Sequence, residues 1–201
     1  MRHRRIGRRL GRSSPHRKAL MKNLACALFL TEREDDFYEG LFQADGKTPI
    51  KPPEFKGRII TTLQKAKEAR PHIERCITLA KRALPHIEEA EKFATSAERN
   101  SEEWRAWRKS DQWNKWANAM APVVNARRRL FAILRDKEAV QIVFDVVAPK
   151  MVGRDGGYTR VLRLARPRLG DAGTRAILEL VGRYDRRKVT ASEKPAFESE
   201  E

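Results

Sequence analysis

Apolar residues recur at helical spacing in the first third of the chain. Ser14 and Pro15 form a pair typical of a helix start, because Ser can cap free backbone N–H groups and Pro needs no such bond at the first position. The apolar positions that follow form one stripe, made of Leu20, Leu24, Ala27 and Leu28. This pattern predicts an amphipathic helix that runs to about residue 30.

Further helices are predicted in the middle of the chain. Thr61 or Thr62 can cap a helix through "LQKAKEAR", which Pro71 should kink or restart before "HIERCITLAKRAL" continues it. The stretch 123–135, "VVNARRRLFAILR", is a second amphipathic pattern. Asp136 can cap the next helix, which ends at Pro149. Its predicted buried stripe consists of Val140, Val143, Phe144 and Val147.

Three stretches instead resemble strands. The first is "RIITTL" at 58–63, and the others are 156–165 and 174–182, which a Gly-containing loop joins into an antiparallel hairpin. A small sheet buries its apolar face most simply against helices on one side. We therefore expect a two-layer α+β fold, with helices packed on a small mixed sheet of one strand plus the C-terminal hairpin. The polar residues 185–201 are expected to be a disordered tail.

Charge separates the chain into unlike parts. The net charge is +16, and no acidic residue precedes Glu32. The nine basic residues before it are Arg2, Arg4, Arg5, Arg8, Arg9, Arg12, Arg17, Lys18 and Lys22. By contrast, residues 32–57 hold seven acidic and four basic residues, and residues 85–121 hold seven and six. So strong an excess of positive charge indicates a polyanionic partner, with nucleic acid the first candidate and an anionic membrane surface the second.

Several other classes fit the sequence poorly. The longest apolar run, "LACALFL", is much shorter than the roughly 20 residues of a membrane span. Gly7 and Gly11 interrupt the amphipathic helix that an Arg-rich transit peptide needs. Cys26 and Cys76 form no CxxC pair, so a disulfide framework is not indicated.

Enzymatic and metal sites are not indicated either. "GRRLGRSS" lacks the spacing of a P-loop, and no nucleophile and base can be paired. The repeated "PHIE" places His72 and His86 at related positions, but each proline favours a helix restart over a shared metal-binding face. We expect no cofactor.

The basic N-terminal arm suits folded RNA better than DNA. Arg alternates there with Gly, Ser and His, so guanidinium groups can pair with phosphates while the backbone approaches closely. Neither a zinc module nor a recognition helix is visible. In "RDGGYTR" (154–160), Tyr158 either stacks on a base beside a phosphate-binding Arg160 or simply covers the sheet edge.

Four tryptophans invite comparison with base-stacking proteins. On one helix, Trp104 and Trp107 would face one way, and Trp113 and Trp116 nearly the opposite way. Two pairs do not make one stacking platform, and the surrounding charge is balanced. Packing on the body or on a neighbouring protein is therefore favoured.

The stretches "MRHRRIGRRLGRSSPHRKALMKNLACAL", "RIITTLQKAKEAR", "ARRRLFAILRDKEAVQIVFDVVAPK" and "GGYTRVLRLARPRLGDAGTRAILELVGR" occur in order. In these stretches the chain resembles the bacterial large-subunit ribosomal protein L-seventeen family. The resemblance covers 1–31, 57–84 and 122–184, which implies a single domain over 1–184 with insertions at 32–56 and 85–121. Neither insertion has surplus positive charge, which suggests that they are not additional RNA contacts. We expect the Trp-bearing insertion to pack on a neighbouring ribosomal protein or to extend into solvent.

The resemblance implies a structural, cytoplasmic protein of the large subunit that binds its ribosomal RNA near the nascent-chain exit. It also implies contact with neighbouring proteins that include protein thirty-two, no catalytic residues, no membrane and no small-molecule substrate. RNA contacts implied at matching positions are Arg2, His3, Arg4, Gly7, Arg12, His16 and Arg17, with Lys65, Lys67, Tyr158 and Arg160 as further candidates. The charge of the arm and of helix 123–135 adds Arg5, Arg8, Arg9, Arg127 and Arg128.

Composition alone would also permit a different protein class. A free-standing, non-specific nucleic-acid-binding protein or RNA chaperone would carry the same positive charge. The two classes differ in an observable way, because a ribosomal protein should be stoichiometric with large subunits and scarce when free. An enzyme is the third and weakest alternative.

Overall fold

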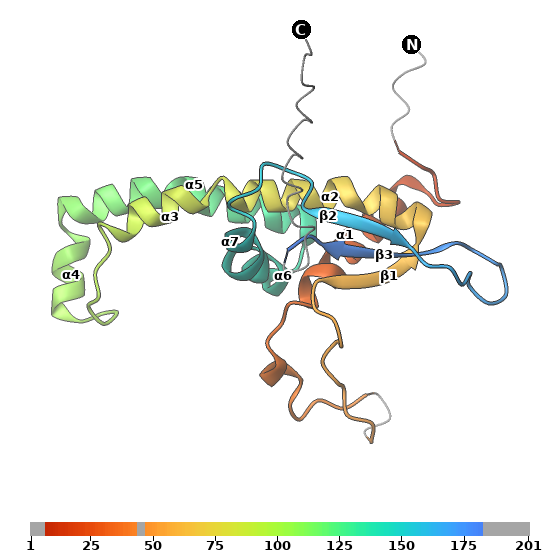
Figure 1. Ribbon diagram of the computed structural model, residues 1–201. Coiled ribbons are helices and arrows are strands. Elements are labelled where there is room, and N and C mark those ends of the chain that lie inside the picture. Colours follow the sequence, from red (N-terminus) through yellow and green to blue (C-terminus); the bar gives the residue numbers. More distant parts are fainter. Residues whose placement is uncertain (1–6, 44–46, 183–201) are drawn as a thin grey trace, which may run out of the picture.

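The computed structural model describes residues 7–43 and 47–182 (Figure 1). The fold is α+β, as the sequence predicts. The elements, in chain order, are α1 (Ser14–Leu30), the 3₁₀ turn η2 (Asp35–Tyr38), β1 (Arg58–Thr62), α2 (Leu63–Lys81), α3 (Leu84–Glu91), α4 (Glu102–Arg108), α5 (Asp111–Leu134), α6 (Lys137–Ile142), the π-helical turn η3 (Val143–Val147), α7 (Ala148–Lys150), β2 (Thr159–Arg163) and β3 (Arg175–Leu180). The expected tail 185–201 lies outside the described residues.

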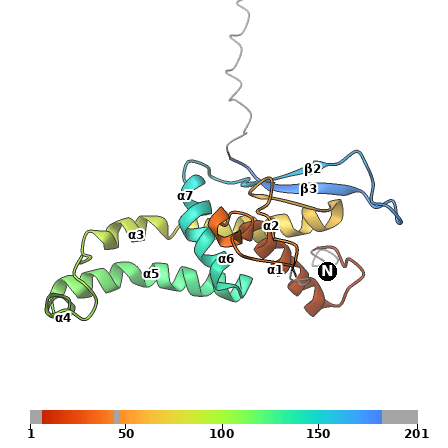
Figure 2. The same ribbon diagram turned by 90° about the horizontal axis from the view of Figure 1, so that it is seen from below.

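The three strands form one antiparallel sheet in the order β1-β3-β2. The predicted hairpin is confirmed, and its second strand lies between β1 and β2. In register, Ile60 faces Ile177, which faces Leu162 on the other side. Because β3 runs against both neighbours, the expectation of a mixed sheet is wrong in this detail. Figure 2 shows the sheet as one layer, with the helices on one side of it.

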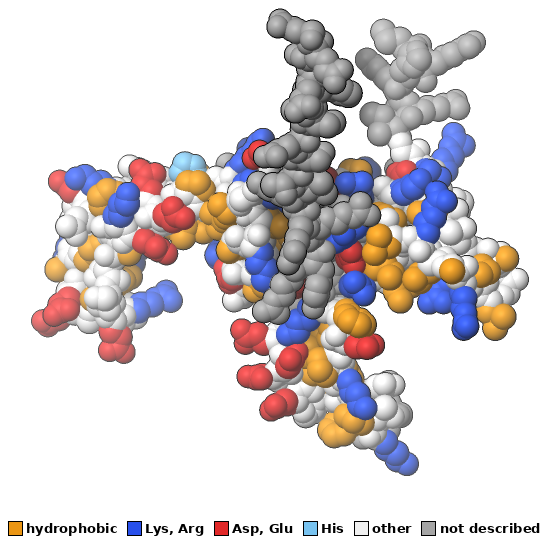
Figure 3. Space-filling view, viewed as in Figure 1, with side chains coloured by type: hydrophobic (Ala, Val, Ile, Leu, Met, Phe, Trp, Pro, Cys, Tyr) orange, Lys and Arg blue, Asp and Glu red, His pale blue; other side chains and the backbone are white. Residues whose placement is uncertain are grey.

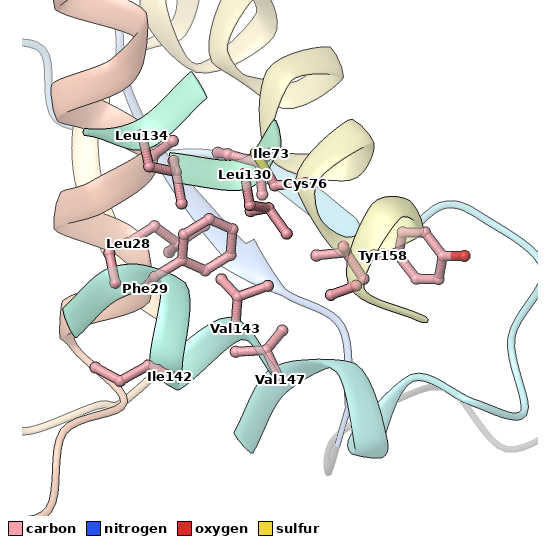
Figure 4. Packing of buried hydrophobic residues seen from close by; sticks show 14 of the residues in the cluster. Leu28, Phe29, Ile73, Cys76, Leu130, Leu134, Ile142, Val143, Val147 and Tyr158 are labelled. Atoms are coloured by element: carbon pink, nitrogen blue, oxygen red, sulfur yellow. The ribbon is translucent and has the colours of Figure 1, made fainter. Parts of the chain in front are cut away.

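Helix α2 lies at the centre of the packing and contacts all three strands as well as α1 and α5. Its buried face is made of small and medium-sized side chains, namely Ala66, Ala69, Ile73, Cys76, Ile77 and Ala80. These pack with Leu28 and Phe29 of α1, Leu130 of α5 and Val143 of η3 (Figure 4). The small residues let the sheet and the other helices approach α2 closely.

Pro71 lies inside the continuous helix α2, so the predicted alternative of a restart at this residue is wrong. Proline removes one backbone hydrogen bond to the residue four positions earlier, which is Lys67. Pro71 and Lys67 are both exposed. The carbonyl that loses its partner can therefore bond to water, and the helix continues.

Each residue in the buried stripe of α1 lies one position after the predicted one. The helix begins at Ser14 after Ser13, with Pro15 in its first turn, and it buries Met21, Ala25, Leu28 and Phe29. Ala27 is exposed. Burial of the large Phe29 ring decides the rotation of the helix, since it removes more apolar area from water than Ala27 could.

The segment from α6 to α7 follows the prediction. The Asp136 carboxylate accepts a hydrogen bond from the backbone N–H of Ala139 at 3.1 Å, which confirms the cap. All four residues of the predicted stripe, Val140, Val143, Phe144 and Val147, are buried.

Helices α3 and α4 and the first half of α5 form a lobe that extends away from the sheet; we call residues 84–121 the helical lobe (Figures 1 and 2). α5 is a single helix that passes through Pro122, so the expected helix at 123 in fact begins twelve residues earlier. The proposed boundary between insertion and core at 121/122 therefore lies inside one helix.

The tryptophans pair across the break between α4 and α5, not along one helix as expected. The Trp107 and Trp116 rings meet edge to face at 5.6 Å, and the Trp107 indole donates to the Phe93 carbonyl at 3.1 Å. The Arg108 guanidinium lies over Trp104 at 5.1 Å and over Trp113 at 5.9 Å. The rings thus hold α4 against α5.

Residues 31–57, which we call the excursion, leave the end of α1 and return to β1. Two ion pairs fix its base to the body: Arg33 with Glu138, and Lys150 with Glu32 at 2.7 Å. The Gly57 N–H donates to the Thr31 hydroxyl at 2.9 Å, and this hydrogen bond joins the first and last residues of the excursion. The excursion is therefore attached at its base, while Phe37, Phe42 and Phe55 remain exposed.

Both cysteines are free thiols inside the helical packing. Burial raises the pKa of Cys26 from 9.0 to about 11, and that of Cys76 from 9.0 to about 12. We expect iodoacetamide at pH 8 to alkylate Cys26 roughly 100-fold more slowly in the native protein than in urea, because each pKa unit lowers the thiolate fraction about tenfold.

The same pKa shifts predict a stability trend. Between about pH 9 and pH 11 the unfolded thiols release protons that the native thiols keep, so the free energy of unfolding should fall as pH rises through this range. Equal alkylation rates in the native and unfolded states would contradict this account.

Candidate nucleic-acid interface

The described part of the arm, residues 7–13, forms a tight turn and is not extended as expected. The Arg12 N–H donates to the Arg9 carbonyl at 3.1 Å, and Leu10 and Gly11 between them have φ of 53° and 63°. Leu10 packs on the edge of the core. The turn therefore brings the backbones of Arg9 and Arg12 close together, and both residues are exposed.

Glu68 of α2 holds the arm in place. Arg8 pairs with this carboxylate at 3.4 Å, and a Cβ on Gly7 would lie only 3.1 Å from its Oε2 atom. Gly7 also has φ of 83°, a conformation that side chains disfavour. The arm thus crosses α2 near its first turns, close to Lys65 and Lys67.

The hairpin loop lies at the same end of the fold. The Leu63 N–H at the start of α2 donates to the Thr174 carbonyl at 3.0 Å, which ties this end of the hairpin to α2. Figures 1 and 2 both place the arm and the loop between β2 and β3 at this end. We call it the basic end; its cationic residues are Arg8, Arg9, Arg12, Lys65, Lys67, Arg163, Arg166 and Arg168.

Acidic residues do not balance this charge. In the arm from residue 7 to 13 there are none, and Asp171 is the one acidic residue between 163 and 175. The Arg168 guanidinium beside Asp171 lowers the pKa of that carboxyl and keeps it ionised. In Figure 3, the charged side chains seen at this end are mostly Lys and Arg, with apolar side chains between them, whereas Asp and Glu gather on the excursion. The arrangement can pair several phosphates at once.

Arginines of the hairpin loop were missed as candidate RNA contacts. Arg163 and Arg166 are exposed, and Leu169 at the tip is fully exposed. The signal was present in "RLARPRLG", a loop with three arginines around a proline. The strand order places the hairpin beside the start of α2. Only this placement shows that the hairpin-loop arginines lie at the same end of the fold as the arm.

The first turn of α1 adds to the basic end. His16 is exposed and Arg17 is half-buried, and this turn contains no acidic residue. The positive end of the helix dipole therefore reinforces the charge of the arm. The other predicted residues of the arm, Arg2, His3, Arg4 and Arg5, lie outside the described residues.

Tyr158 and Arg160 do not fit the expected RNA contact. Tyr158 is 2% exposed, its ring lies in the core (Figure 4), and its hydroxyl donates to the Asp155 carbonyl at 3.4 Å. A base cannot reach this ring, so the alternative in which Tyr158 is a structural residue is favoured. Arg160 is engaged with Glu179 at 2.9 Å.

Glu179 sits between two arginines across the sheet. Its carboxylate is 2.8 Å from Arg58 of β1 and 2.9 Å from Arg160 of β2, and the residue is 7% exposed. We expect Glu179→Gln to lower the free energy of unfolding by about 2 kcal/mol, because two half-buried guanidinium groups lose their counter-charge. Urea denaturation measures this, with the exposed Glu91→Gln as control. Equal stability of the two variants would contradict the role of Glu179.

Arg127 and Arg128 lie on α5 and do not join the basic end. The Arg127 guanidinium lies over the Phe144 ring at 5.0 Å and 3.9 Å from the Asp145 carboxylate. Arg128 is exposed and borders a shallow groove with Met120 and Val124. These two arginines therefore belong to a different surface of the protein.

The described residues contain no group of three or more His, Cys, Asp or Glu side chains that could hold a metal ion. No helix among them is long and apolar enough to span a membrane. A polyanion-binding surface is the chemistry that the described geometry supports best.

Comparison with known proteins decides the family. Residues 55–181 match the sequence profile of the family described as Ribosomal protein L17. The chain belongs to the ribosomal protein L17 family. This confirms the resemblance found in the sequence, and membership makes the chain a structural ribosomal protein rather than an enzyme.

Proteins of the L17 family align with most of this chain. The large ribosomal subunit protein bL17 of Rhodopirellula baltica is 59% identical over 100% of this chain and 90% of its own length. The bL17 proteins of Acidobacterium capsulatum and Sulfurimonas denitrificans are 31% and 34% identical over 90% of this chain, covering 73% and 100% of their own lengths. The first alignment includes the arm, which lies outside the matched profile.

Proposed function

We propose that this L17-family protein binds large-subunit ribosomal RNA through its basic end. It is a structural protein of the large ribosomal subunit and acts in the cytoplasmic ribosome. The observation that carries the proposal is the convergence of arm and hairpin arginines on one end of the fold, with Arg9, Arg12 and Arg166 exposed. Guanidinium groups from two separate segments can clamp phosphates of neighbouring RNA strands.

The remaining residues of the interface follow from this placement. Lys65, Lys67, His16 and Arg17 border the arm, and we assign them to the same RNA surface. Arg2, His3, Arg4 and Arg5 precede it in the chain and extend the same run of positive charge. Tyr158, Arg160, Arg127 and Arg128 are not included, because the first two are engaged within the fold and the others lie on α5.

The proposed location is near the nascent-chain exit, beside other large-subunit proteins that include protein thirty-two. Exposed apolar side chains on the excursion, which has more acidic than basic residues, support protein neighbours there: Phe42 and Phe55 are each 54% exposed. Such side chains gain more from a protein surface than from an RNA backbone.

Cross-linking in purified large subunits tests the RNA interface. Ultraviolet irradiation followed by mass spectrometry should give RNA-linked peptides from residues 7–13 and 163–168, and none from 102–116 of the helical lobe. The alternative, a free-standing non-specific nucleic-acid-binding protein, predicts linkage to any RNA present and little protein in the subunits. RNA-linked peptides confined to the lobe would contradict the proposed interface.

A further inference from the structure

We propose that the outer face of α5 binds an α-helix of a neighbouring large-subunit protein, and that this helix places a carboxylate against Arg128. The inference rests on the proposed function, since it requires a protein neighbour within the subunit. The surface that would bind the partner lies on the helical lobe and on the adjoining half of α5.

An apolar seam runs along this face of α5. Its members are Trp113, Ala117, Met120, Val124 and Phe131, spaced by four, three, four and seven residues. Val124 is 39% exposed and Phe131 is 43% exposed, although both are large apolar side chains. Alternating steps of four and three residues are the spacing by which one helix packs along another.

Within the seam, Val124 and Phe131 are left exposed by the rest of the protein, whereas Trp113, Ala117 and Met120 are half-buried. Val123, the neighbour of Val124, is fully buried, and it points about 100° away round the helix, toward the body. α3 and α2 pack on α5. A shallow groove follows the seam and is bordered by Trp116, Ala117, Met120, Ala121, Val124, Asn125 and Arg128. It offers a partner helix a place for its own side chains.

The positive charge of Arg128 beside the seam favours a partner helix with an acidic side chain. Arg128 lies one helical turn beyond Val124, borders the groove, is exposed, and has no carboxylate within 4.0 Å among the described residues. Its neighbour Arg127 is instead turned to Phe144 and Asp145. An acidic side chain on the partner would satisfy Arg128, whereas an unpaired guanidinium inside the contact would cost free energy.

RNA fits this surface less well than a protein helix does. The groove is bordered by apolar side chains, Asn125 and a single cation, Arg128. The helical lobe beside it has seven acidic and six basic residues. A phosphate backbone needs several cations in a row, as the basic end provides. Trp113 of the seam already lies under the Arg108 guanidinium, and Trp116 at the groove already packs on Trp107, so these rings hold α4 on α5 instead of offering a face to a base.

A photo-cross-linking residue at Ala121, in the groove, tests the proposal in purified large subunits. Lys115 is exposed on the opposite face of α5 and is the matched control position. We expect the Ala121 probe to link to one peptide of one large-subunit protein, helical and carrying Asp or Glu, and the Lys115 probe not to link to that peptide. Linkage of the Ala121 probe to RNA, to a second copy of this chain or to nothing would overturn the proposal.

Charge reversal identifies the contact. Arg128→Glu should lower the yield from the Ala121 probe at least fivefold, whereas Arg105→Glu on α4 should leave it unchanged. Replacing the linked carboxylate of the partner by Lys should restore the yield in Arg128→Glu subunits. Absence of restoration would overturn the pairing. Copy number per subunit is measured in the same preparations, so failure of the proposed function is seen separately as loss of the protein from the subunits.

Discussion

Replacing Arg2, Arg4, Arg9 and Arg12 by Ala is expected to lower the affinity for large-subunit ribosomal RNA by roughly a hundredfold to a thousandfold. Arg9 and Arg12 are exposed on one turn of the arm, and Arg2 and Arg4 extend the same run of charge. Arg8 is left in place because its pair with Glu68 holds the arm on α2.

The salt dependence separates phosphate contacts from a general loss of structure. Each phosphate contact removed should reduce the slope of log affinity against log salt by about 0.7 to 0.9. The four substitutions together should therefore flatten it by roughly 3. Filter binding between 50 and 300 mM salt would measure this slope.

A charge-matched control comes from the helical lobe. Alanine at Arg99, Arg105, Lys109 and Lys115 removes the same four charges from exposed positions that lie outside the basic end. We expect this variant to keep most of its affinity and its slope. If both variants lose affinity equally, net charge and not the basic end determines binding.

Replacing Phe29 by Ala is expected to lower the free energy of unfolding by about 3–5 kcal/mol. The side chain is fully buried, and its ring lies among residues of α1, α5 and η3 (Figure 4). Truncation leaves a cavity where three helical segments meet. Domains of this size are stable by about 5–15 kcal/mol, so the variant should unfold at a much lower urea concentration.

The control for Phe29 is an apolar residue of the surface. Val152 is 55% exposed, and Val152→Ala should change the free energy of unfolding by less than about 0.5 kcal/mol. Urea denaturation followed by circular dichroism compares the two. A small effect of Phe29→Ala would show that α1 is not fixed by this packing.

Local signals in the sequence correctly predicted those elements whose structure is determined by residues close together in the chain. The Asp136 cap, the stripe from Val140 to Val147 and the hairpin 156–182 were found because each is determined by neighbours in the chain. Predictions that depended on tertiary contacts were less successful. The tryptophan pairs were wrong because a break at Ser110 separates Trp107 from Trp113 into different helices.

The basic end was only partly predictable for the same reason. The charge of the arm is visible in the sequence, but its turn at Leu10 and Gly11 and its pairing with Glu68 are not. Arg166 joins the arm through the strand order β1-β3-β2, which no local pattern specifies. The Tyr158 side chain has an apolar ring and a polar hydroxyl, so the sequence permits either a surface or a core position. Only its burial in the structure shows that it belongs to the core.

The most direct test is sedimentation of a tagged copy of the protein from cell lysate through a sucrose gradient in high salt. We predict that it stays with the large subunit at one copy per particle, because many contacts from the arm and hairpin loop act together. Release of the protein into the light fractions would contradict a structural role in the subunit. It would indicate that the basic end binds polyanions in general.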